Sequence, residues 1–150
     1  MKSRTIAAMF AAFSVATGAH AAGQQDFGKA VEQRYRAVEG TIKARDGARW
    51  LTEFYSPEAV VVGEGSKEAL RGHDALRPVV NGIVKDTRSC TIRPDAARQA
   101  SADLGYSFVT YQCSPADAAA ADYQVRALFV WKKTPAGWRV VAESYTMGSM

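Results

Sequence analysis

The stretch FYSPEAVVVG, residues 54–63, marks the change from helix to strand around which the chain is organised. Upstream of it, Asp46 is the predicted N-cap of a short amphipathic helix. Pro57 is expected to end that helix, because proline lacks the amide hydrogen that a helix interior needs. The β-branched run that follows predicts a short strand over residues 59–62, which two nearby glycines terminate.

Two further helices are indicated by apolar residues that recur every three or four positions. The first pattern lies upstream, in Phe27, Val31, Tyr35, Val38 and Ile42. The second lies downstream, in Leu76, Val79, Val80, Ile83 and Val84. The segment from Gly72 to Asp74 is expected to open the downstream helix. The predicted helices therefore all lie before the long strands of the C-terminal half.

After Asp86 the apolar period changes from 3.6 to 2, which predicts strands. Four strands are expected at about 88–99, 104–113, 122–133 and 138–147. Helices followed by consecutive strands predict an α+β domain in which an antiparallel sheet packs on the helices.

Residues 1–21 have the features of a cleaved secretory signal peptide. Lys2 and Arg4 precede a short apolar run, and Ala19-His20-Ala21 forms an A-x-A cleavage pattern. A core helix of the domain is the alternative. Cleavage would leave one domain, residues 22–150, that is periplasmic or secreted and has no membrane segment. The formal net charge of +4 would fall to +2, so the charge gives no indication of nucleic-acid binding.

The two cysteines are placed to pair across the first long hairpin. If Ser101 and Ala102 form its centre, Cys90 lies opposite Cys113. Ile92 then lies opposite Tyr111. A disulfide between these cysteines suits an exported protein and would stabilise the fold by roughly 3 kcal/mol. Two buried free thiols, or a catalytic thiol, are the alternatives.

The last hairpin is predicted to pair Lys133 with Trp138 and to continue in that register. Ala127 then lies opposite Ser144 on the inner, apolar face. Arg126 and Glu143 would lie on the outer face as an ion pair, along with Tyr145 and Val141. An acid–base pair or an anion clamp is the alternative for Arg126 and Glu143.

Three segments in order resemble the SnoaL-like and ketosteroid-isomerase-like proteins of the nuclear transport factor 2-like superfamily. They are FYSPEAVVVG (54–63), RGHDAL (71–76) and GWRVVAESYT (137–146). The resemblance implies a cone-shaped barrel, in which a strongly curved antiparallel sheet wraps around the N-terminal helices. It also implies a pocket inside the cone and a homodimer through the outer face of the sheet.

The resemblance implies catalytic roles that this sequence fills only in part. Tyr35, in QRYRAVEG (33–40), matches the helix tyrosine of ketosteroid isomerases. The position of the catalytic base falls on Gly63, with Glu64 displaced by one residue. The later acid falls near the apolar Ala127 or Phe129. His73 is the one histidine after residue 21, so a histidine metal cluster is not expected, nor is a cofactor.

Our leading hypothesis from the sequence is a non-catalytic pocket for a small apolar or aromatic molecule. The candidate binding residues are Tyr35, Trp50, Tyr55, Tyr123 and Ser144. The enzymatic alternative is an isomerase, dehydratase or cyclase that acts on a small hydrophobic substrate through Tyr35 with Glu64 or His73. The third alternative is a dimeric interaction module without a ligand.

Overall fold

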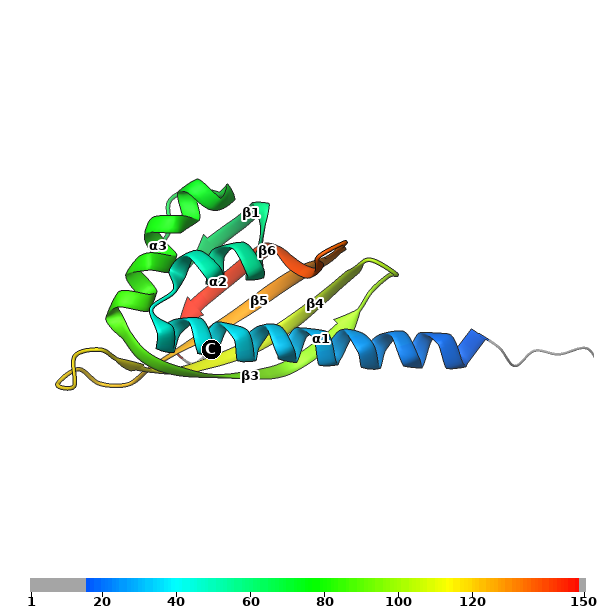
Figure 1. The fold of residues 1–150 in the computed structure, drawn as a ribbon, viewed down its shortest axis with the longest axis horizontal. Coiled ribbons are helices and arrows are strands. Elements are labelled where there is room, and N and C mark those ends of the chain that lie inside the picture. Colours follow the sequence, from blue (N-terminus) through cyan, green and yellow to red (C-terminus); the bar gives the residue numbers. More distant parts are fainter. Residues whose placement is uncertain (1–15, 149–150) are drawn as a thin grey trace, which may run out of the picture.

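Three helices pack against one curved sheet in the computed structural model, which describes residues 16–148 (Figure 1). The helices are α1 (Ala16–Ala44), α2 (Gly47–Phe54) and α3 (Gly72–Asp86). The strands are β1 (Tyr55–Gly63), β2 (Leu70–Arg71), β3 (Thr87–Gln99), β4 (Leu104–Pro115), β5 (Tyr123–Thr134) and β6 (Gly137–Met147). The predicted α+β class is therefore confirmed.

The six strands form a mixed sheet in the order β2-β1-β6-β5-β4-β3. Strands β3 to β6 pair antiparallel as a meander, whereas β1 pairs parallel with β6. The expectation of a purely antiparallel sheet closed into a barrel is therefore wrong. The edge strands β2 and β3 remain apart, so the sheet stays open. An alternation of apolar and polar residues predicts strands, and consecutive strands are expected to pair as hairpins. The alternation does not indicate a pairing between strands that are distant in the sequence, such as β1 and β6.

The first strand begins earlier than the sequence predicts, directly after α2. Pro57 lies inside β1, in the irregular segment between Tyr55 and Val60 where pairing with β6 shifts register. Proline is tolerated there because it lies outside the regular ladder of hydrogen bonds. The predicted N-cap is confirmed, since the Asp46 side chain accepts a hydrogen bond from the Arg49 amide at 2.9 Å.

The predicted apolar stripe of α1 is buried along its whole length, from Phe27 to Ile42. The Phe27 ring packs edge-on against Trp138, with ring centroids 4.7 Å apart. Gly105 makes room for this contact, because a Cβ there would overlap the Phe27 ring. The Gln24 side chain bonds to the backbone of β3, which anchors α1 along the edge of the sheet.

The predicted register of the β3–β4 hairpin is confirmed around the cysteines. Cys90 lies opposite Cys113, and Ile92 lies opposite Tyr111. The two cysteines form a disulfide, as the sequence predicts. The register then shifts by one residue after Pro94, towards the tip of the hairpin.

The predicted register of the β5–β6 hairpin is right near the turn and wrong beyond it. Lys133 pairs with Trp138 and Trp131 with Val140, as expected, but Val130 pairs with Ala142. Val141 is therefore an extra residue, a β-bulge. A bulge reverses which side chains face inward along the rest of the strand.

The reversal moves Glu143 and Tyr145 to the concave face and Ser144 to the outer face. Glu143 now pairs with Phe129, and Tyr145 with Ala127, both of which are buried on the inner side. The predicted outer-face position of Glu143, beside Arg126, is wrong for this reason. The predicted inner-face position of Ser144 is wrong for the same reason.

The predicted signal peptide lies mostly outside the described residues. Helix α1 already includes residues 16–21, the first that the structure describes, and continues through the predicted apolar stripe. Export and cleavage stay predictions. No helix in residues 16–148 is both long and apolar enough to cross a membrane.

Candidate functional site

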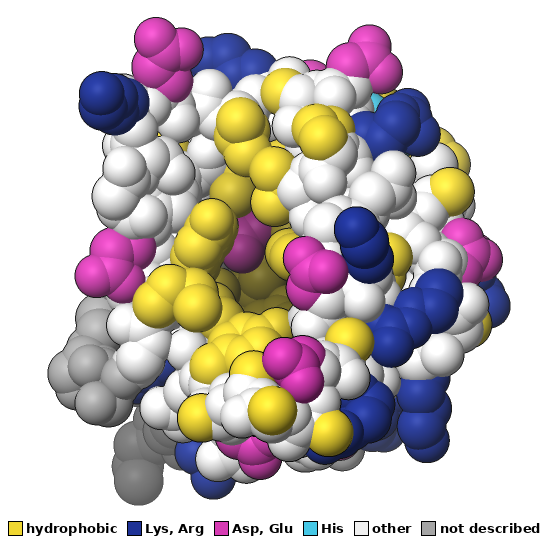
Figure 2. Space-filling view, turned by 90° about the vertical axis from the view of Figure 1, so that its left-hand side faces the viewer, with side chains coloured by type: hydrophobic (Ala, Val, Ile, Leu, Met, Phe, Trp, Pro, Cys, Tyr) yellow, Lys and Arg dark blue, Asp and Glu magenta, His cyan; other side chains and the backbone are white. Residues whose placement is uncertain are grey.

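A cavity of about 520 Å³ lies between α3 and the concave side of strands β3 to β6. Figure 2 shows its mouth as a hollow framed by hydrophobic side chains, with an acidic side chain inside. Five aromatic residues from five elements form much of its wall: Trp50, Tyr55, Tyr111, Tyr123 and Tyr145. Pro78, Val79 and Ile83 of α3 close the opposite side.

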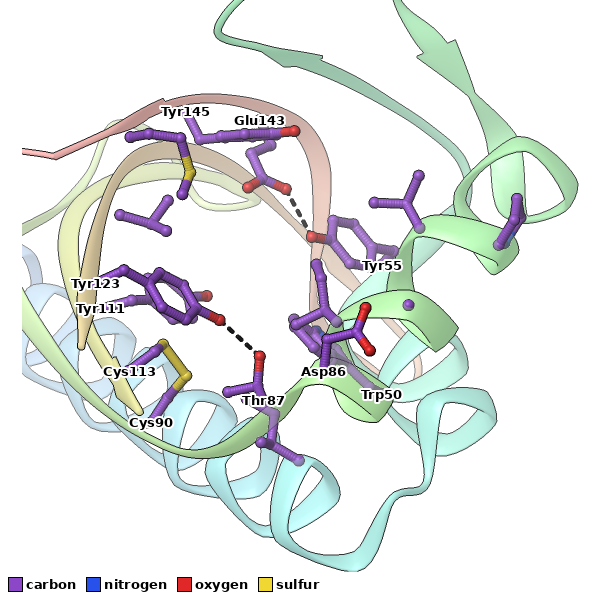
Figure 3. A pocket seen from close by; sticks show the side chains of 17 residues that line it. Trp50, Tyr55, Asp86, Thr87, Cys90, Tyr111, Cys113, Tyr123, Glu143 and Tyr145 are labelled. Atoms are coloured by element: carbon purple, nitrogen blue, oxygen red, sulfur yellow. Dashed lines mark hydrogen bonds between the residues drawn. A yellow bond between two sulfur atoms is a disulfide. The ribbon is translucent and has the colours of Figure 1, made fainter. Parts of the chain in front are cut away.

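The carboxyl group of Glu143 projects into this apolar space (Figure 3). The Tyr55 hydroxyl donates a hydrogen bond of 2.6 Å to Glu143 Oε2. Burial raises the pKa of Glu143 from 4.5 to about 7, and the hydrogen bond from Tyr55 opposes that rise. Glu143 can therefore gain or lose a proton near neutral pH.

The tyrosines of the wall supply neutral hydroxyls. Burial raises the pKa values of Tyr55 and Tyr111 well above 10, and the charge of Glu143 adds to this rise. The pKa of Tyr145 is also raised, by burial first and Glu143 second. These phenols donate hydrogen bonds and do not act as bases near neutral pH.

The base of the cavity is held by covalent and polar links between strands. The Cys90–Cys113 disulfide joins β3 to β4 and forms part of the wall. The hydroxyls of Thr87 and Tyr123 lie 2.6 Å apart and link the start of β3 to β5 (Figure 3). Cavity-lining residues on three strands are thus fixed relative to one another.

Residues 29–148 match the SnoaL-like domain family. The chain belongs to the SnoaL-like domain family. This match spans most of the chain and confirms the resemblance seen in the sequence. No curated protein matches the sequence.

Solved structures similar to this SnoaL-like domain share its nuclear transport factor 2-like fold. A ketosteroid isomerase-like protein from Erwinia carotovora atroseptica SCRI1043 is 17% identical, with a TM-score of 0.66, covering 81% of this chain and 96% of that one. A nuclear transport factor 2-like superfamily protein from Salmonella enterica serovar Typhimurium LT2 is 18% identical, with a TM-score of 0.62. The match covers 87% of this chain and 94% of that one. A protein named "Putative Scytalone Dehydratase" from Novosphingobium aromaticivorans DSM 12444 is 12% identical, with a TM-score of 0.68. The match covers 86% of this chain and 89% of that one.

Three of the five predicted binding residues of this SnoaL-like domain line the cavity, namely Trp50, Tyr55 and Tyr123. Tyr35 instead lies in the core, where its hydroxyl is 2.7 Å from Ser107 Oγ and burial raises its pKa. The indole of Trp131 donates to the same Ser107 Oγ. Ser144 is exposed on the outer face and does not line the cavity.

The structure does not bring the predicted catalytic candidates Tyr35, Glu64 and His73 together. Glu64 is exposed, and its Oε2 accepts a hydrogen bond from the Met147 amide at 2.6 Å, which fixes the end of β6. His73 Nε2 lies 3.2 Å from the Tyr55 carbonyl oxygen. Neither residue lines the cavity.

At Gly63, where the resemblance places a catalytic base, the Tyr145 side chain occupies the space. A Cβ at Gly63 would overlap the hydroxyl end of Tyr145. Glycine is therefore required for this position of the ring. The carboxyl group of this SnoaL-like domain instead reaches the cavity from β6, as Glu143.

The cavity is also lined by Glu143, Tyr111 and Tyr145, which the sequence does not predict as site residues. Tyr111 was paired correctly with Ile92, and its inward direction follows from that pairing. Glu143 and Tyr145 are two positions apart in β6, so they share a face of the strand, but the sequence does not show which face that is. Their direction depends on the bulge at Val141, which no residue pattern marks. Within residues 16–148, no three acid, cysteine or histidine side chains gather as a metal site.

Proposed function

We propose that this chain is an exported SnoaL-like domain that binds a small, largely apolar or aromatic molecule in the cavity above β3 to β6. The observation that carries the proposal is the cavity itself, whose aromatic wall contains the carboxyl group of Glu143. Its volume of about 520 Å³ lies in the range of small-molecule sites. A few polar groups in an apolar wall are typical of such sites, since they orient a ligand that apolar contacts retain. The disulfide supports export.

A neutral fluorescent probe, N-phenyl-1-naphthylamine, tests this proposal with purified protein. The wild type should bind the probe saturably and raise its emission. Ile83→Trp, which fills the cavity from α3, should weaken binding by about tenfold or more. Val62→Trp is the matched control, because Val62 is exposed and does not line the cavity. Equal binding by both variants would contradict the proposed site.

The second candidate function is acid–base catalysis, and the pKa of Glu143 near 7 favours it. The carboxylate would remove a proton from a carbon next to a carbonyl group and return it at another carbon, so that a double bond moves. A ketosteroid isomerase-like protein is among the similar structures. Glu143 would be the proton carrier, in place of Glu64 or His73.

Conversion of 3-cyclohexen-1-one to its conjugated isomer, followed by ultraviolet absorbance, tests this candidate. The rate should rise with pH around a midpoint of about 7, because the carboxylate form is the base. Glu143→Gln should lower the rate by roughly 100-fold or more. Glu58→Gln, at an exposed acid, should leave it unchanged. A rate that does not depend on Glu143 would rule out this chemistry for the ketone.

A further inference from the structure

The cavity contains acids and aromatic rings but no basic side chain. Seventeen residues line it, and Glu143 and Asp86 are the two acids among them. No lysine, arginine or histidine belongs to this lining, within the part of the chain that the structure describes. Asp86 is exposed at the end of α3, whereas Glu143 is only partly exposed. The site therefore has no positive charge to balance its carboxylates.

Glu143 has one oxygen available to a ligand. The Tyr55 hydroxyl occupies Oε2, and no hydrogen bond from the described residues reaches Oε1. No ion pair in residues 16–148 includes Glu143. An unpaired carboxylate in an apolar wall is costly, and a cation beside it removes most of that cost.

The aromatic residues of the wall add a second attraction for positive charge. Trp50, Tyr55, Tyr111, Tyr123 and Tyr145 come from α2, β1, β4, β5 and β6 and line the same space (Figure 3). The faces of such rings attract ammonium groups through their quadrupoles, most strongly where water is excluded. Rings combined with a carboxylate favour a cation over a neutral group of the same shape.

We propose that the ligand is a small organic cation, an ammonium group attached to an apolar or aromatic body, which places its positive nitrogen beside Glu143. This inference rests on the proposed function, since it assigns a chemical class to the ligand of the same cavity. The apolar body would lie against α3, where Val79 and Ile83 form the wall.

A neutral ligand with a carbonyl group is the competing class, because protonated Glu143 could donate a hydrogen bond to it. The two classes of ligand should have opposite effects on the protonation of Glu143 when they bind. Titratable groups facing the same cavity are Tyr55, Tyr111, Tyr123 and Tyr145 on the strands and Asp86 at its mouth. With a pKa of about 7, Glu143 is near half protonation at pH 7. A cation should therefore release about half a proton on binding, whereas a carbonyl ligand should take up about half a proton.

Benzyltrimethylammonium and its neutral carbon isostere, neopentylbenzene, test the inference by displacement of N-phenyl-1-naphthylamine. The cation should bind at least about tenfold more tightly than the isostere. Its affinity should rise as the pH increases through about 7. Calorimetry in two buffers of different ionisation enthalpy should detect the released proton.

Glu143→Gln should reduce the preference for the cation and leave binding of the isostere unchanged, while Glu58→Gln should change neither. The comparison of the two ligands on the wild type needs no variant, so a folding defect cannot decide the result. A cation that binds no more tightly than the isostere, or that takes up protons, overturns the inference. Retained probe binding would then preserve the proposed function, and loss of probe binding would overturn both.

Discussion

Glu143 combines three properties that set the chemistry of the cavity. It lies among aromatic side chains, it accepts one hydrogen bond from Tyr55, and no cation in the described residues pairs with it. Burial and the Tyr55 hydrogen bond act on its pKa in opposite directions, and burial prevails. The result is a carboxyl group whose charge depends on pH in the neutral range.

The raised pKa of Glu143 should make folding stability depend on pH. Between 4.5 and about 7 the folded protein retains a proton that the unfolded chain releases. The contribution of Glu143 to stability should therefore be greatest below pH 4.5, fall by up to about 3 kcal/mol as the pH rises to 7, and level off above. Urea unfolding of wild type and Glu143→Gln at several pH values measures this difference. Glu58→Gln should track the wild type, and parallel curves for wild type and Glu143→Gln would contradict the expectation.

Removal of the Tyr55 hydroxyl should raise the pKa of Glu143 further. Its hydrogen bond stabilises the carboxylate, so Tyr55→Phe leaves that form less favoured. NMR titration of ¹³C-labelled glutamate side chains would report a midpoint above about 7. Tyr123→Phe is the control, because the Tyr123 hydroxyl lies against Thr87. A midpoint that stays in place or falls in Tyr55→Phe would show that the hydrogen bond does not act on Glu143.

In the two long hairpins the positions of the strands can be predicted from the sequence, but their register can be predicted only in part. Periodicity predicts the strand positions closely, and a hairpin centre at Ser101 and Ala102 predicts the register of β3 and β4 near Cys90 and Cys113. The register of β5 and β6 followed from the turn and held only as far as Trp131. Beyond it, one extra residue changed the direction of every side chain, and Glu143 was misplaced. Bulges depend on packing across the whole sheet, which a local pattern does not contain.

The disulfide between β3 and β4 should contribute strongly to stability. It joins residues separated by 23 positions, and restricting a loop of that length in the unfolded chain is worth about 3 kcal/mol. Urea unfolding of the Cys90→Ser/Cys113→Ser variant should show a loss of about this size. Dithiothreitol should lower the stability of the wild type and leave that of the variant unchanged. Identical stability of the oxidised and reduced wild type would be inconsistent with the bond.

The sheet as a whole has a second apolar surface on its convex side. Leu104, Tyr106 and Phe108 of β4 point outward and are each about two-fifths exposed, at 41%, 39% and 41%. The rings of Tyr106 and Phe108 contact each other edge-on. Exposed apolar clusters of this kind often form interfaces. We propose that this surface joins two copies of the chain, as the family resemblance implies.

A charge in this surface should dissociate the dimer. Phe108→Lys should shift the protein from dimer to monomer in sedimentation velocity and weaken association by at least about tenfold. Ala48→Lys is the control, since Ala48 is exposed on α2 and does not line the cavity. Tyr145, which the sequence predicts on the outer face, is unsuitable for this experiment because its side chain lines the cavity. A dimeric Phe108→Lys variant with native circular dichroism would argue against this interface.

The extra residue at Val141 has a consequence for how such a site can arise in a gene. Strand side chains alternate between two sides, so inserting a single codon exchanges the two sides for every later residue of the strand. In β6 that exchange places Glu143 and Tyr145 inside and Ser144 outside. One three-nucleotide insertion, with no substitution at any cavity position, would therefore move an acid from the outer face of the sheet into the cavity.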